Sequence, residues 1–282
     1  MDAFVPRTFE EALEVKAAHH EAVPVMGGTD LMVDVNFGRL RPPSLLDLSR
    51  VDELSSWHRT NGSVFLGAGM TFARIARELG EFRPLAEAAL TVGSAQIRSR
   101  ATIGGNLATA SPAGDGIPPL AAWDAEIVIA SVGGRRRRIP WHEFLLGPKR
   151  TVLEHDELIA GVEWKVADGP GSFAKIGPRN ANVIAVAGVC VQLDEPSRSV
   201  RVALGSVGPT VLRAYEAESL AAEAIPWDEP GEGLPQEALT AFGELVAAAA
   251  TPINDLRGSA EFRRHAVAQL SRRLLAWTLE DR

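Results

Sequence analysis

Residues 100–115, which read RATIGGNLATASPAGD, gather small and polar side chains in one short stretch. Gly104 and Gly105 lack a Cβ atom and tolerate positive φ, so a ligand can approach their backbone directly. Asp115 can accept a hydrogen bond from a sugar hydroxyl. Further donors and acceptors lie between these positions, at Thr102, Asn106, Thr109 and Ser111. The stretch therefore favours close binding of a polar ligand, although a tight turn before a helix capped by Ser111 would use the same residues.

A second pair of glycines, Gly27 and Gly28, follows the short apolar stretch 23–25. We expect a strand, a glycine turn and then a helix opened by Thr29 and Asp30. Free backbone amides and the positive end of a helix dipole would meet there, an arrangement that suits a phosphate or pyrophosphate. Considered alone, the pair is equally compatible with a turn of no chemical importance.

The two glycine pairs and Asp115 together suit a ligand with an anionic middle and hydroxylated ends. A flavin dinucleotide meets that description. Backbone amides would bind its pyrophosphate, hydroxyl and amide side chains its ribityl chain, and Asp115 its sugar hydroxyls.

The elements that must position these loops follow from periodicity and capping signals. Thr8 and Glu11 have capping-box spacing and predict a short amphipathic helix over residues 8–20. Strands are expected at 45–48 and 63–71, with Thr71 capping the next helix. Residues 67–69 read GAG but make no dinucleotide fingerprint, because Phe72 stands where the third glycine would be. Helices at 85–90 and 117–123 and a strand at 126–131 are also expected.

The second half of the chain changes character after a plausible linker at 166–171. Strands at 174–176, 184–193 and 200–207 predict a separate antiparallel sheet, and helices are expected at 214–224, 236–250 and 259–280. The arginine run 135–138 follows a Gly-Gly turn. We interpret it as a solvated hairpin tip rather than a docking site for an acidic partner.

Composition excludes several classes of protein. The chain has 282 residues, 46% of them hydrophobic, and a formal net charge of -7, which argues against a nucleic-acid-binding surface. Its one cysteine, Cys190, lies in an apolar run, so the chain alone builds neither a disulfide framework nor an iron–sulfur cluster. The N-terminus lacks the pattern of a signal peptide, and no apolar run is long enough to span a bilayer. We expect a soluble, cytoplasmic protein that does not bind nucleic acid.

Four segments carry a resemblance to a known family: 24–31, 96–115, 202–213 and 257–265. Together they resemble the FAD-binding medium subunit of molybdenum hydroxylases, the carbon monoxide dehydrogenase and xanthine dehydrogenase family. The resemblance implies an α+β fold. A two-part FAD-binding α/β domain of the PCMH type would occupy 1–168, with subdomains of about 1–57 and 58–168. A C-terminal flavoprotein domain with a small antiparallel sheet and a helical bundle would occupy 171–282.

The resemblance also implies the cofactor-binding residues and predicts no catalytic or metal-binding residue in this chain. The pyrophosphate would be wrapped by Val25, Met26, Gly27, Gly28, Thr29, Asp30 and Leu31. The rest of the FAD would meet Ile97, Thr102, Gly104, Gly105, Asn106, Thr109, Ser111 and Asp115. Val152 or Leu153 would lie near the flavin ring, and Lys175 would approach it from the C-terminal domain. Met26 departs from the family's usual alanine and makes its loop bulkier, and Val183 stands where the family usually has aspartate. The segment 257–265 is more simply a solvated helix face capped by Asp255 or Ser259.

The resemblance places the substrate chemistry on other chains. A large subunit would carry the molybdenum cofactor and a small subunit the 2Fe-2S clusters, in a dimer of heterotrimers. This chain would hold non-covalent FAD, which takes electrons from the clusters and passes them to an external acceptor. Two alternatives stay open from the residues alone. One is a stand-alone flavin oxidase or dehydrogenase, and the other is a nucleotide-binding scaffold without redox turnover.

Overall fold

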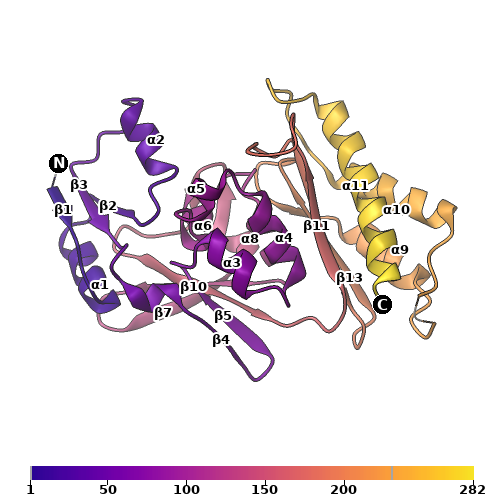
Figure 1. Ribbon diagram of the computed structural model, residues 1–282, viewed down its shortest axis with the longest axis horizontal. Coiled ribbons are helices and arrows are strands. Elements are labelled where there is room, and N and C mark those ends of the chain that lie inside the picture. Colours follow the sequence, from indigo (N-terminus) through magenta and orange to yellow (C-terminus); the bar gives the residue numbers. More distant parts are fainter. Residues whose placement is uncertain (1, 230) are drawn as a thin grey trace.

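The computed structural model describes residues 2–229 and 231–282, and its three larger sheets follow one another from the N-terminal end to the C-terminal end (Figure 1). Helices cover each sheet. The mixture of helices with largely antiparallel sheets confirms the expected α+β class.

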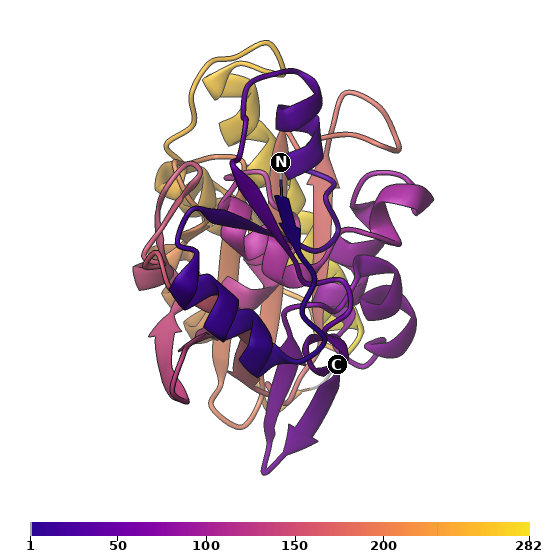
Figure 2. The same ribbon diagram turned by 90° about the vertical axis from the view of Figure 1, so that its left-hand side faces the viewer.

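The N-terminal part is a small parallel sheet with two helices. Its elements are β1 (Asp2–Phe4), α1 (Phe9–Ala18), β2 (Ala22–Val25), α2 (Leu31–Asn36) and β3 (Ser44–Asp47), with strand order β1-β3-β2. The predicted capping box is present, because Thr8 Oγ1 accepts from the Glu11 amide and the Glu11 carboxylate accepts from the Thr8 amide. Helix α2 begins after Asp30, close to where the sequence predicts it, but none of its residues is buried. It stands away from the sheet (Figures 1 and 2).

The middle part is built on a five-stranded antiparallel sheet of order β4-β5-β10-β6-β7. Its strands are β4 (Trp57–Thr60), β5 (Ser63–Gly67), β6 (Glu126–Ser131), β7 (Arg135–Pro140) and β10 (Leu158–Lys165). Its helical elements are η1 (Asp52–Ser55), α3 (Phe72–Glu78), α4 (Arg83–Thr91), α5 (Ala95–Arg98), α6 (Ile103–Thr109), α7 (Ile117–Ala122) and α8 (Trp141–Phe144). A two-stranded sheet, β8 (Leu145–Gly147) with β9 (Arg150–Thr151), completes it. As predicted, Thr71 caps α3 by accepting from the Arg74 amide.

The arginine run does not form a hairpin tip, so that interpretation was wrong. It forms the edge strand β7, and Arg137 makes two hydrogen bonds of 2.7 and 2.6 Å to the nearly buried carboxylate of Glu157. Arg138 donates a single hydrogen bond of 2.9 Å to Glu163 on β10, at a more exposed position. Arginine at an edge strand is compatible with a sheet because the guanidinium can reach carboxylates on a neighbouring segment while its stem covers the strand.

The C-terminal part packs helices on a four-stranded antiparallel sheet of order β11-β12-β13-β14. Its elements are β11 (Gly171–Ile176), β12 (Ala187–Asp194), β13 (Ser199–Gly205), β14 (Leu212–Arg213), α9 (Tyr215–Ala224), α10 (Gln236–Ala249) and α11 (Ala260–Glu280). The predicted sheet and helices are therefore present. Ser259, one of the two predicted caps, accepts from the Phe262 amide at the start of α11.

Two hydrophobic cores hold these layers. The larger core fills the first two parts of the chain and extends to one face of the C-terminal sheet through Phe173, Cys190 and Ala203. The smaller core lies between the C-terminal sheet and helices α9 to α11. Direct hydrogen bonds join the parts. Glu87 on α4 accepts from the Phe173 amide, and the buried Trp123 indole donates to Gln192 at 2.9 Å. Within the described residues, every helix is too short or too polar to cross a bilayer.

Candidate functional site

The two glycine pairs have different structures. Gly104 and Gly105 lie in the first turn of α6, and neither has positive φ. A Cβ atom at Gly104 would lie 2.6 Å from the Ala68 Cβ and 2.7 Å from the Ala68 carbonyl oxygen, so this glycine permits close packing of α6 on the chain after β5. Gly105 is exposed, and the sole neighbour of an added Cβ would be Thr102 Oγ1 at 3.1 Å. Only Gly105 offers an open surface to a ligand.

The backbone amides at the start of α6 are already used. The Ile103 amide donates to Met70 O and the Gly104 amide to Ala68 O, at 3.0 and 2.8 Å. The Gly105 amide donates to the hydroxyl of Thr102, which is the N-cap of α6. Ser111, the cap in the alternative interpretation, is not an N-cap, because the next helix, α7, begins at Ile117. The expectation that a ligand reaches these amides is therefore wrong, because each has a partner in the protein.

The loop of residues 27–30, hereafter the amide loop, differs from the start of α6 because its backbone amides are not used by other described residues. Within the described part of the chain, none of its four backbone N–H groups donates to another atom, and Asp30 makes no capping bond to α2. Gly28 has a φ of 73°, which lets successive amides turn toward one side. A run of unsatisfied N–H groups is a binding surface for an anion.

Three contacts hold residues 26–30 against α6 and the turn that precedes it. Thr109 Oγ1 lies 3.5 Å from Asp30 Oδ2, and Arg100 Nη2 donates to Met26 O at 3.3 Å. A side chain on Gly27 would collide with the Arg100 carbonyl group, so this glycine is required by the close approach of the two segments. Farther along α2, Lys149 Nζ lies 3.3 Å from Asp34 Oδ2. The amide loop therefore lies beside α6. The exposed Arg100 guanidinium is next to the loop, and its positive charge would favour binding of an anion there.

Met26 does not enlarge the loop as its size suggests. Its side chain is half-buried and packs on the first hydrophobic core, and its methyl group occupies the space that a side chain at Gly69 would need. The neighbouring Val25 ends β2 and pairs with Asp47, while Thr29 and Leu31 are half-buried at the start of α2.

Asn106 lies on α6 beneath the loop that carries Asp115. A Cβ atom at Gly114 or Gly116 would lie 2.9 Å from the Asn106 amide group, so the two glycines let the loop close over this side chain. Its Oδ1 atom is buried and has no hydrogen-bond partner among the described residues. Ser111 accepts from the Ala113 amide and shapes the same loop.

Asp115 and Lys175 form a buried ion pair between the middle and C-terminal parts. Lys175 Nζ lies 2.5 Å from Asp115 Oδ2, and the two side chains are 6% and 9% exposed. Burial raises the pKa of Asp115 to about 6, and the nearby Lys175 ammonium opposes that increase. The structure thus brings together two residues of the predicted site, and the Lys175 side chain is buried.

The remaining predicted residues lie around this arrangement. Ile97 on α5 is 37% exposed, and its carbonyl group accepts from the Arg100 amide. Val152 and Leu153 follow β9, are half-buried and pack on the first core. The Lys149 amide just before β9 donates to Ala110 O at the end of α6, which joins that region to the site.

Sequence reasoning missed four contributors: Arg100, Lys149, Asp34 and the Thr91 carbonyl group, which accepts from Lys175 Nζ at 2.9 Å. Arg100 stands inside the glycine motif, and its charge beside a presumed anion site was a usable signal. The other three make contacts with residues that are distant in the sequence, so no local sequence pattern indicates them.

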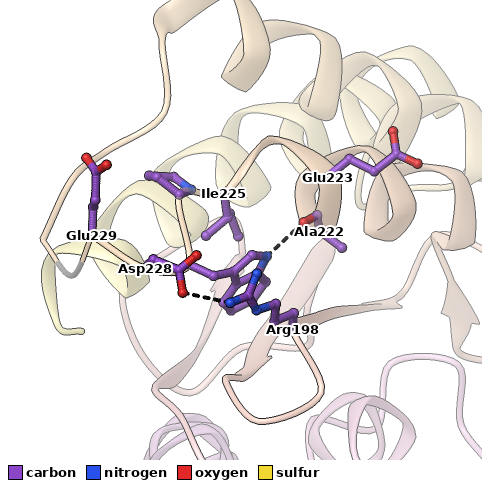
Figure 3. Close-up of a pocket in the computed structure, with 8 residues that line it drawn as sticks. Arg198, Ala222, Glu223, Ile225, Asp228 and Glu229 are labelled. Atoms are coloured by element: carbon purple, nitrogen blue, oxygen red, sulfur yellow. Dashed lines mark hydrogen bonds and ion pairs between the residues drawn. The ribbon is translucent and has the colours of Figure 1, made fainter.

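The described residues fit a flavin dinucleotide. The amide loop supplies four free donors for a pyrophosphate. Gly105 leaves open space beside α6. Asn106, on the same helix, has an Oδ1 atom without a hydrogen-bond donor among the described residues. A separate groove of about 370 Å³ lies in the C-terminal part, between the β12–β13 turn and the α9–α10 connection. It is lined by Arg198, Trp227 and Asp228 among others (Figure 3) and includes none of the predicted site residues.

Comparison with known proteins identifies the families that the chain resembles. Residues 1–164 match the FAD binding domain in molybdopterin dehydrogenase, and residues 172–278 match the CO dehydrogenase flavoprotein C-terminal domain. The chain is 32% identical over 231 residues to the nicotinate dehydrogenase FAD-subunit of Eubacterium barkeri, covering 77% of this chain and 78% of the relative. It is 30% identical to the carbon monoxide dehydrogenase medium chain of Hydrogenophaga pseudoflava, covering 91% and 90%. The solved carbon monoxide dehydrogenase of that organism superposes with a TM-score of 0.86 at 28% identity, covering 99% of this chain and 98% of the other.

Proposed function

The chain belongs to the FAD-binding subunits of the molybdopterin dehydrogenase family, and on that premise we propose that it is the electron-transfer subunit of a heterotrimeric molybdenum hydroxylase. Electrons would arrive from iron–sulfur clusters on a small partner subunit and leave for an external acceptor. The substrate would be oxidised at the molybdenum cofactor of a large partner subunit. The "medium chain" in the name of one relative supports this division of labour.

The amide loop is the observation that carries the proposal. Its four N–H groups have no partner within the described chain, and leaving such donors unsatisfied costs free energy unless water or a ligand bonds them. A pyrophosphate would satisfy them, with the Arg100 guanidinium adding favourable charge.

The chain's own groups would act by binding and orientation. The amide loop would hold the pyrophosphate, Thr109 and Asn106 would offer hydrogen bonds along the ribityl chain, and Val152 and Leu153 would exclude water near the flavin ring. FAD would supply the redox chemistry when bound, and the protein would supply position and electrostatics. The buried Cys190 agrees with that assignment, since burial raises the pKa of its thiol far above neutrality and leaves it inert.

Release of the cofactor tests the proposal directly. The full chain, purified with the chains that accompany it, should release FAD in an amount equimolar with the chain when it is denatured. Absorption and chromatography of the supernatant identify the flavin. A preparation that contains no FAD and binds none would refute the proposed function and favour a nucleotide-binding scaffold.

The assembly needs a separate experiment. We propose a large molybdenum-containing subunit and a small 2Fe-2S subunit as partners, arranged as a dimer of heterotrimers. An affinity-tagged chain should copurify with both, and the complex should contain molybdenum and iron. Isolation of the chain alone as an active flavin oxidase would contradict this assembly.

A further inference from the structure

Lys175 occupies an unusual position for a lysine. It lies on β11 of the C-terminal part and its side chain is 6% exposed, whereas lysines are rarely buried unless they are paired. Its partner Asp115 belongs to the middle part of the chain, so this charged pair crosses the junction between the two.

Every N–H group of the ammonium has a partner. Lys175 Nζ donates to Asp115 Oδ2 at 2.5 Å, to the Thr91 carbonyl oxygen at 2.9 Å and to the Val183 carbonyl oxygen at 3.1 Å. An ammonium has three N–H groups, so these bonds leave none for another acceptor. Lys175 is therefore placed to hold protein segments together and has no spare donor for a ligand.

The three acceptors lie on three separate segments. Thr91 ends α4, Asp115 lies in the loop after α6, and Val183 lies in residues 177–184, the first eight residues of the β11–β12 connection. This connection is largely exposed and is organised by Arg179, which donates to the Ala181 and Asn182 carbonyl groups. Lys175 ties its far end to the Asp115 loop that Asn106 supports from beneath.

We propose that Lys175 is a positioning residue that clamps the 177–184 connection and the Asp115 loop to each other, so that the C-terminal part sets how long FAD stays bound. This inference rests on the proposed FAD site. Asp115 acts in the clamp mainly as the counter-ion of Lys175.

The test compares three forms of the full chain, each purified with its accompanying chains. Lys175→Met keeps most of the side-chain volume and removes the three donors. The double variant Lys175→Met/Asp115→Asn also removes the carboxylate that the single variant leaves buried and unpaired. Because an unpaired buried charge can itself unfold a protein, the double variant keeps the test valid if the single variant misfolds. Lys165→Met, at an exposed lysine on β10, is the matched control.

Hydrogen exchange and flavin release report the clamp independently. In both Lys175 variants we expect faster amide exchange in residues 111–116 and 177–184, an altered visible circular dichroism of the bound flavin, and FAD dissociation about tenfold faster than in the wild type. The control should match the wild type. Restoration of all three properties in the double variant would overturn the clamp, because it would reduce Lys175 to a counter-ion. Unchanged exchange in both segments would overturn it too. A wild-type complex that lacks FAD would refute the proposed function instead, and the exchange comparison would still decide the clamp.

Discussion

Substitution of the adjacent glycines Gly104 and Gly105 by alanine should separate folding from cofactor binding. At Gly104 the new Cβ would lie 2.6 Å from the Ala68 Cβ and 2.7 Å from the Ala68 carbonyl oxygen. Both are fixed parts of the chain after β5 and cannot rotate away. Overpacking of this kind costs about 1–3 kcal/mol of folding free energy.

Gly105→Ala should behave differently because its side chain would point to solvent. Replacing glycine by alanine within a helix stabilises it by roughly 0.5–1 kcal/mol. The new methyl group would lie 3.1 Å from Thr102 Oγ1, which offsets part of that gain by crowding the N-cap. The net change in stability should therefore stay within about 1 kcal/mol, while the methyl group occupies the open surface beside the amide loop.

Two measurements on the same preparations check this reasoning: the thermal unfolding midpoint and the FAD content after gel filtration. Gly104→Ala should lower the unfolding midpoint by several degrees, because each kcal/mol shifts it by about 2–4 °C in domains of this size. At temperatures below the unfolding transition this variant should still retain FAD. Gly105→Ala should keep the midpoint and lose FAD, and Gly105→Val should abolish FAD retention with the C-terminal part still folded. Normal FAD content in Gly105→Val would refute the placement of the cofactor beside α6.

Three further outcomes follow from the structure. Gly28→Ala should weaken FAD binding and lower stability by about 1 kcal/mol, because φ is 73° at that position; unfolding in urea and FAD titration measure both. The folded-state pKa of Asp115, about 6, lies above its ordinary value of 3.8, so its contribution to stability is complete below pH 3.8 and is lost as the pH rises through 6. Asp115→Asn should remove this contribution to the pH dependence of the free energy of unfolding, measured by urea unfolding between pH 4 and pH 7. An unchanged pH dependence would contradict the raised pKa of Asp115. Thr8→Ala should cost about 1 kcal/mol in the same assay through loss of the α1 cap and leave FAD content unchanged.

Local signals in the sequence located most of the helices and the C-terminal sheet. The capping residues Thr8, Thr71 and Ser259 carry their information within one turn, and all three caps are present. Strand β10 was overlooked, although it is the central strand of the middle sheet. Its sequence, LIAGVEWK, alternates poorly because the strand is buried on both faces. The arginine run was misplaced because its carboxylate partners are distant in sequence. The proposed domain boundaries stay a prediction.

The site was predicted by residue type, but the roles within it depend on contacts that sequence does not encode locally. Gly104 and Gly105 are adjacent residues of the same type. Only the position of Ala68 in the folded chain shows that Gly104 is needed for packing and that Gly105 is exposed. Asp115 was assigned to a sugar hydroxyl because its lysine partner lies on another part of the chain. The FAD contacts of these residues remain predictions.

The satisfaction of backbone amides determines which glycine segment can take the anion. A helix start attracts anions through N–H groups that lack partners, and α6 has lost that capacity because Met70, Ala68 and Thr102 accept from its first three amides. The amide loop precedes a helix of six residues, whose dipole is small, yet its four N–H groups have no partner within the described chain. The unpartnered N–H groups therefore support our proposal that residues 27–30 bind the pyrophosphate and that α6 provides shape through Gly105 and polar side chains. We therefore expect the more conspicuous glycine motif, at 104–105, to contribute no backbone hydrogen bonds to the phosphates.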